Sequence, residues 1–513
     1  MDETAPSAPN PAVAALAGRA GTGGILTAMC TCLVLVVASV SALNLAMPEL
    51  AVDLSASTTS LTWIADAYTV ALAALVLPIG ALGDKFGRRD ILIGGTVVFA
   101  IGSVAAAFAD STSTLIAWRA VMGVGAAMIM PGTLSTITAA FPADRRTHGV
   151  AIWSGFAAAG AILGMLVAGL LLEVWSWRSI FVASAVMAVV GGLLALVLAP
   201  NTRDEEGHPL DHLGAYTSAV AIGAFVYGII EGSEVGWTNG PVVGSFAVSA
   251  AALALYAVLG FRNKHALLDP RLFGIPGFRA GAATVLVQFL AVFGFFFVGL
   301  QYLQLILGYS ALKSAIALVP IALVVMPVSA LTPRLTVRLG IKAVMSGGLL
   351  LLAAGIYALS FLHTDSGYLP FLGGLILAGL GVGMTSAVGT SVIVGSLRAD
   401  QQGVASAMND ATREVGAAIG IALMGSVFSS YYASSLPALD QLPSTAAHAV
   451  ESSAAAGLQA AAQLGPQGEP LAMAVRSAFI DGLSASLIVV AVIVALAALG
   501  ALLQAPRTQT APQ

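Results

Sequence analysis

Long apolar runs separated by short polar loops divide this sequence, and they limit the chain to one kind of fold. A helix needs roughly 20 apolar residues to cross the hydrocarbon core of a bilayer, and about fourteen runs reach that length. They cover residues 24–47, 61–82, 91–109, 113–140, 149–174, 179–199, 213–230, 242–261, 280–303, 314–331, 343–362, 369–394, 404–430 and 483–503. Only 9% of the 513 residues are charged, whereas soluble domains have roughly 25%. The sequence therefore predicts an all-α polytopic membrane protein.

The basic residues are concentrated on alternate loops between these runs. If the amino terminus lies inside the cell, sixteen of the 21 Lys and Arg residues face the cytoplasm, and only Arg178, Lys313 and Arg476 face outside. Membrane proteins carry an excess of Lys and Arg on the cytoplasmic side. The asymmetry therefore supports the number of spans and predicts that both termini are cytoplasmic.

The runs fall into two sets of six with two runs between them. We expect a disordered cytoplasmic tail over 1–23, a six-helix bundle over 24–200, a linker and inserted helix pair over 201–262, a second six-helix bundle over 263–504, and a cytoplasmic tail over 505–513. Residues 431–480 are expected to form an extracellular loop with a short amphipathic helix around 445–464; a mobile cover and a passive linker are both open for it. Short basic loops follow the second and tenth runs, as in transporters built from repeats.

Ionisable side chains inside the runs indicate a functional or structural role, because inserting each one into the membrane costs at least ~2.5–3.5 kcal/mol. Asp66 lies near the start of the second run, where it is either wetted at the outer end or faces a central cavity. Loss of water favours the protonated form of a carboxyl group. Arg119, in the fourth run, must pair with a carboxylate, backbone carbonyls or trapped water, and a purely structural anchor is its alternative role.

The thirteenth run contains three charged residues within five positions. Asp410 and Glu414 are neighbours on one helical face, four residues apart. Arg413 is one turn from Asp410 and can neutralise it, which would leave Glu414 the freer carboxylate. A wetted helix start is the alternative interpretation of this cluster.

Several classes of site are not indicated. No His/Cys cluster has the ligand spacing of zinc, and no Walker A motif is present for ATP. Cys30 and Cys32 are expected to be small buried hydrophobic residues. Clustered acids for metal and phosphate, or a nucleophile site, are also lacking, which argues against an integral-membrane enzyme. We expect no cofactor, no metal and no nucleic acid, and a proton gradient as the energy source.

A loop motif after the second run carries the most specific resemblance to a known family. Its pattern G-x-L-x-D-x-x-G-R-[KR] is matched by Gly80, Leu82, Asp84, Gly87, Arg88 and Arg89, and a fourth-span pattern is matched by Leu115, Arg119, Gly123 and Gly125. On these residues the chain resembles the major facilitator superfamily, specifically its fourteen-span drug/proton antiporters. The resemblance covers nearly the whole chain and implies the major facilitator fold, two six-helix bundles with two inserted helices. It also implies that the loop motif latches the cytoplasmic side, where we expect Asp84 to cap the next helix and pair with Arg88.

Two departures from the family pattern change the expected sites. The antiporter motif of the fifth span keeps Gly160, Gly164 and Gly169, but Met165 replaces its proline and Ala168 one glycine. Small faces for close packing remain, whereas the proline kink is lost.

In the first span, a pattern that ends at Asn44 and Pro48 has Ser39 where the family usually has Asp. A hydroxyl cannot cycle a proton near neutral pH. The resemblance therefore assigns proton coupling to Asp66, Asp410 and Glu414.

Together with the ionisable residues inside the spans, the resemblance implies a proton-coupled efflux antiporter of a bacterial cytoplasmic membrane. It would export small amphipathic, often cationic compounds by alternating access, as a monomer. The alternative is a dedicated exporter of one endogenous metabolite, lipid or antibiotic, which need not use protons. The candidate cavity residues are Asn44, Trp63, Tyr68, Trp153, Phe156, Phe293, Phe296, Gln301 and Met384. Ordinary packing is the alternative for each of them.

Overall fold

The computed structural model describes residues 11–54, 56, 58–203, 210–263, 266–397, 401–437, 439, 447, 450–451 and 453–505. Within these residues it is helical, without strands, and fourteen helices are long and apolar enough to cross a membrane. This confirms the predicted number of spans.

The helices follow one another with short connections. Their bounds are α1 Pro11–Asp53, α2 Thr58–Phe86, α3 Arg88–Ala107, α4 Thr112–Ala140, α5 Ala143–Leu172, α6 Arg178–Leu198, α7 His212–Val235, α8 Gly240–Arg262, α9 Pro276–Gln301, α10 Ala311–Leu339, α11 Ile341–Leu359, α12 Tyr368–Val394, α13 Gln402–Ser435, α15 Ala454–Gln463 and α16 Glu469–Gln504, with short helices η1 Pro270–Gly274, η2 Tyr302–Ile306 and η4 Gly465–Gly468.

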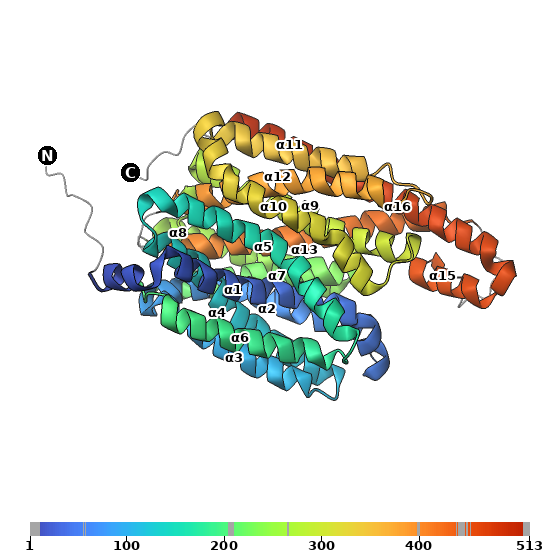
Figure 1. Cartoon of the computed structure of the whole chain (residues 1–513), viewed down its shortest axis with the longest axis horizontal. Coiled ribbons are helices and arrows are strands. Elements are labelled where there is room, and N and C mark those ends of the chain that lie inside the picture. Colours follow the sequence, from blue (N-terminus) through green and yellow to red (C-terminus); the bar gives the residue numbers. More distant parts are fainter. Residues whose placement is uncertain are drawn as a thin grey trace.

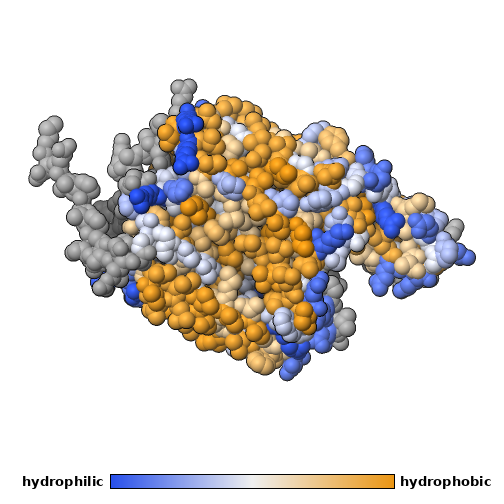
Figure 2. All heavy atoms as spheres, in the orientation of Figure 1, coloured by the Kyte–Doolittle hydropathy of each residue, from blue (hydrophilic) through white to orange (hydrophobic). Residues whose placement is uncertain are grey.

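The long helices lie side by side along one axis (Figure 1). Helices α1 to α6 pack together in one bundle, and α9 to α13 pack with α16 in a second. Helix α1 begins and α16 ends at the left of Figure 1; we call this the basic end, because the α2–α3 turn, the start of α5 and the end of α10 bring Lys and Arg there. Figure 2 shows an apolar surface across the middle of the molecule and hydrophilic residues toward its ends, the pattern of a membrane-spanning protein.

The two inserted helices occupy different environments. Helix α7 packs against both α2 and α13, one helix from each bundle. Ala73, Val226 and Ala418 form a small apolar cluster where these three helices meet. Helix α8 packs mainly on α7 and leaves most of its side chains exposed. Helix α7 therefore closes the seam between α2 and α13 from the side.

Two segments differ from the expected loops. Residues 11–23 belong to α1, with a break at Gly21, where φ is 63°; this corrects the expected disorder, and the physical reason is the alanine-rich composition with proline at the first helical position. Residues 1–10 lie outside the described part.

The second difference concerns the last connection, predicted over 431–480. Helix α13 continues to Ser435 and α16 begins at Glu469, so much of this segment is helical. Ala472, Val475 and Phe479 form a buried stripe at helical spacing, while the exposed Glu469 and Asp481 lower the hydropathy of the segment. Helix α15 lies inside the predicted amphipathic region, and Figure 1 shows it at the right end beside the start of α16.

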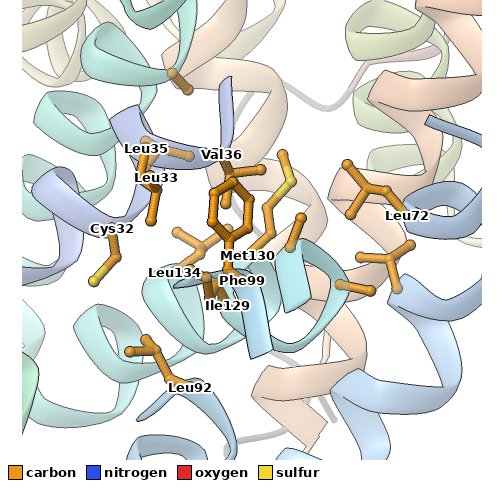
Figure 3. Close-up of a cluster of buried hydrophobic side chains, with 14 of the residues drawn as sticks. Cys32, Leu33, Leu35, Val36, Leu72, Leu92, Phe99, Ile129, Met130 and Leu134 are labelled. Atoms are coloured by element: carbon orange, nitrogen blue, oxygen red, sulfur yellow. The ribbon is translucent and has the colours of Figure 1, made fainter. Parts of the chain in front are cut away.

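The first bundle has a tightly packed core. Figure 3 shows side chains from α1 to α4 meeting there, with Cys32 beside Leu33 and Phe99 nearby. Both cysteines are buried and unpaired, which confirms their role as small hydrophobic residues.

Close backbone approach between α1 and α5 depends on Gly164. A Cβ atom at this position would lie 2.5 Å from the Cα atom of Ala38. We expect Gly164→Ala to lower stability by about 1–3 kcal/mol, because the helices would have to separate. Thermal unfolding of the purified protein in detergent measures the effect. Gly244→Ala on α8, where a Cβ meets nothing within 4 Å, is the matched control; equal unfolding temperatures for the two variants would contradict the prediction.

Candidate functional site

Asp84, at the end of α2, joins the two bundles at the basic end. One of its oxygens accepts from Arg88 Nη2 at 2.6 Å and from the backbone N–H of Gly403 at 2.9 Å, and the other accepts from the N–H of Val404 at 3.1 Å. Gly403 and Val404 form the first turn of α13. Asp84 therefore caps α13 of the other bundle and not α3, which corrects the expectation. The free N–H groups of a helix start attract a carboxylate wherever that helix lies in the sequence.

Small residues allow this contact. A Cβ atom at Gly80 would lie 2.6 Å from the Cβ of Ala407 and 2.9 Å from the carbonyl oxygen of Gly403. Helices α2 and α13 thus touch almost backbone to backbone at this level.

The other residues of the loop motif have different environments. Gly87 takes a φ of 116° in the turn between α2 and α3, a conformation that favours glycine. Arg88 is buried and also donates to Thr202 Oγ1 at 3.2 Å. Arg89 is not part of the contact between bundles; it lies 3.4 Å from Asp90.

The hydrophobic core continues across the bundles at the basic end. The core of the first bundle includes Val285 of α9, Ile393 of α12 and Ala405 of α13. The basic end is therefore closed by hydrogen bonds and an ion pair near its surface and by apolar packing beneath them.

Arg119 of α4 is bound by backbone carbonyl groups, one of the three predicted kinds of partner. Its guanidinium donates to the oxygens of Ile64 at 2.9 Å and Ala65 at 3.2 Å, and lies 4.6 Å from the centre of the Tyr68 ring. Asp66, half-buried on the same stretch of α2, acts electrostatically on Arg119.

Arg413 of α13 is enclosed on several sides. It lies 3.5 Å from Asp410, and both side chains are buried. The guanidinium also lies 4.4 Å from the ring centre of Phe289 on α9 and 5.0 Å from that of Trp153 on α5. Since Trp153 belongs to the first bundle, this cation–π contact is a second tie between the bundles.

The three acids predicted for proton coupling occupy unequal positions. Asp410 is fully buried, accepts from Asn409 at 3.3 Å, and has one oxygen without a described partner. Glu414 is half-buried and forms no hydrogen bond or ion pair with the described residues. Asp66 and Glu414 therefore lie on α2 and α13, the two helices of the seam.

The prediction that Trp153 and Tyr68 line a cavity is wrong. Trp153 and Tyr68 have no exposed surface. Trp153 Nε1 donates to Thr133 at 2.9 Å, and Tyr68 donates to the carbonyl of Val36 at 3.0 Å. Each ring instead lies over a buried guanidinium, Tyr68 over that of Arg119 and Trp153 over that of Arg413, in a cation–π contact.

The remaining cavity candidates keep some exposed surface. They are Asn44, Trp63, Phe156, Phe293, Phe296, Gln301 and Met384. Phe293 contacts both Phe289 and Phe296, with ring centres 5.8 and 6.3 Å apart, so α9 presents a short aromatic row. The ring centres of Trp63 and of Tyr227 on α7 lie 5.5 Å apart. The sequence did not indicate this contact.

The glycines of the fifth-span motif pack against both bundles. Gly160 and Gly164 face α1, and Gly169 faces Leu312 of α10. Met165, at the proline position, is buried in the core of the second bundle. Helix α5 runs without an internal proline, as expected from the replacement.

Residues 29–421 match the family model described as Major Facilitator Superfamily. The chain belongs to this superfamily. Its members are transporters and not enzymes, which confirms that expectation.

Two relatives and one solved structure illustrate the similarity. The chain is 31% identical to the "Multidrug efflux pump LfrA" of Mycolicibacterium smegmatis, over 89% of this chain and 91% of the relative. It is 32% identical to the "Cephamycin export protein CmcT" of Amycolatopsis lactamdurans, over 79% and 85%. The crystal structure of the human organic anion transporter MFSD10 has the same fold, with a TM-score of 0.63, 15% identity, and coverage of 94% of this chain and 99% of that one.

The cap on α13 can be tested by accessibility. We expect Asp84→Asn to increase opening of the basic end roughly tenfold, since charge-assisted hydrogen bonds contribute about 1.5–3 kcal/mol. The readout is the rate at which a water-soluble maleimide modifies Ser406→Cys, a fully buried position, with Cys30 and Cys32 replaced by alanine. Asp90→Asn is the control, because Asp90 is an exposed acid of the same turn; equal rates in both variants would disprove the role of Asp84.

The buried Asp410–Arg413 pair predicts a pattern of stabilities. Asp410→Asn should destabilise the protein by about 3 kcal/mol, because it leaves the charge of Arg413 uncompensated. Combining it with Arg413→Met should restore much of the loss. Thermal unfolding in detergent measures both, with the exposed Asp110→Asn as control. An Asp410→Asn protein as stable as the control would show that Asp410 is uncharged in the folded state.

Proposed function

We propose that this protein is a proton-coupled antiporter that exports small amphipathic, often cationic compounds. The observation that carries the proposal is the position of Asp66 and Glu414. These half-buried acids lie on α2 and α13, the two helices whose ends close the basic end. A change in their protonation therefore acts on the helices that must separate during transport. The multidrug and cephamycin exporters among the relatives support export as the direction of transport.

The basic end is proposed to face the cytoplasm of a bacterial cell. Its Lys and Arg residues greatly outnumber those at the opposite end, where Arg178, Lys313 and Arg476 lie. This follows the usual distribution in membrane proteins. Both termini would then be cytoplasmic, and the structure would be closed on that side.

Transport would require the two bundles to rock about the seam. Opening toward the cytoplasm separates Asp84 from the start of α13 and Trp153 from Arg413. Substrate that enters from the cytoplasm and protons that enter from outside favour opposite states, so they compete through one equilibrium. One charge moved across 100 mV contributes ~2.3 kcal/mol. The energy would come from the proton gradient without a cofactor, and a monomer contains all of these parts.

A dedicated exporter is the second candidate, and the similarity to a cephamycin export protein favours it. Efflux of several unrelated cations from proteoliposomes separates the two functions. A multidrug pump exports most of them, whereas a dedicated exporter moves one class of compound only.

Proton coupling is tested most directly at Asp66. We expect Asp66→Asn to abolish drug efflux driven by a pH gradient in proteoliposomes, because an amide cannot carry a proton. Asp110 is an exposed acid, so Asp110→Asn is the matched control. We expect this variant to transport like the unmodified protein. Unchanged drug/proton exchange by Asp66→Asn, with the protein folded, would overturn the assignment.

A further inference from the structure

A groove at the basic end lies between the two bundles, away from the acids of the seam. Residues 22–26 of α1, the start of α5 and the end of α10 line this open groove, whose volume is about 690 Å³. Leu26 and Phe141 supply apolar walls, and Arg145, His148, Arg334 and Arg338 supply basic groups. The lining contains no acidic residue among the described ones.

The basic groups of the groove converge from both bundles. Arg334 and Arg338 are four residues apart on α10, hence on one face of the helix. Both are exposed, and neither forms an ion pair with a described residue. His148 faces the same space from α5. Arg334 and Arg338 therefore bring to the groove positive charge that no described residue neutralises.

Apolar and basic surfaces meet in this groove at the boundary of the membrane-spanning region. Spans begin at Gly21 and Arg145 and end at Leu339 on the three helices concerned. Lipid headgroups lie at this level, and basic pockets between spanning helices bind anionic headgroups. A cationic compound would be repelled by the arginines, and a zwitterionic lipid offers no net charge to them.

We propose that this groove binds an anionic phospholipid of the adjoining leaflet. Its phosphate would lie between Arg334, Arg338 and His148, and an acyl chain would follow Leu26 and Phe141. Because α5 belongs to the first bundle and α10 to the second, the bound lipid would stabilise their present arrangement over one in which they separate. The proposal concerns lipid binding and does not require that the protein exports drugs.

The experiment measures lipid binding by native mass spectrometry of the full-length protein in detergent. The probes are phosphatidylglycerol and phosphatidylcholine with identical acyl chains. We expect tighter binding of phosphatidylglycerol, and a roughly thirtyfold loss when Arg334→Gln and Arg338→Gln are combined, from the contribution of each basic residue near an anionic lipid. Arg262→Gln combined with Arg271→Gln removes two charges from the same end outside the groove and should leave the affinity unchanged.

A second variant tests the groove without a change of charge. A Cβ atom at Gly23 meets nothing within 4 Å, so Gly23→Phe should fold and fill the space beside Leu26. We expect it to lower phosphatidylglycerol affinity about tenfold, the effect of losing a few buried CH₂ contacts. The same affinity in the groove variants as in the control pair would overturn the proposal. It would also be overturned if inorganic phosphate alone displaced the lipid, or if deletion of residues 2–10 raised lipid affinity, since the groove would then hold a free anion or the chain's own acidic amino terminus.

Discussion

The closed basic end depends on one carboxylate. Asp84 is buried, and burying a carboxylate is costly unless its charge is paired and its oxygens accept hydrogen bonds. Arg88 supplies a charge, and two N–H groups at the start of α13 supply the remaining donors. The bonds require α2 and α13 to lie against each other, which Gly80 permits because it has no side chain. Separation of the bundles must therefore expose Asp84 to water at the same step.

The two buried arginines illustrate different ways of keeping a charge in a membrane protein. Arg119 is held by carbonyl groups of α2, within the first bundle, so it can stay bound while the bundles rock. Arg413 lies between Asp410 and two aromatic rings, one of which belongs to the other bundle. Motion between the bundles leaves the first environment intact and disrupts the second. Arg413 contacts both Asp410 and the other bundle. A change in the charge of Asp410 therefore affects the packing of the bundles, and a change in that packing affects Asp410.

Helix α7 connects the inserted helix pair to both bundles. It packs along both helices of the seam, and its Tyr227 contacts Trp63 on α2. Apolar side chains of α7 cover the seam beside Val70 and Ala73 of α2 and Val415 and Ala418 of α13.

The sequence by itself determined the spans, the asymmetry of basic charge and the few charges inside the spans. Each depends on local properties: hydropathy over about 20 residues and the cost of an ionised group in lipid. It did not predict that Asp84 caps α13, because a helix start accepts any carboxylate that reaches it. The sequence also left Arg119 with three possible kinds of partner, and it left open whether Trp153 and Tyr68 line a cavity or pack in the core. Only the packing of distant helices decided these points, since burial and bonding belong to neighbours that are far apart in the chain.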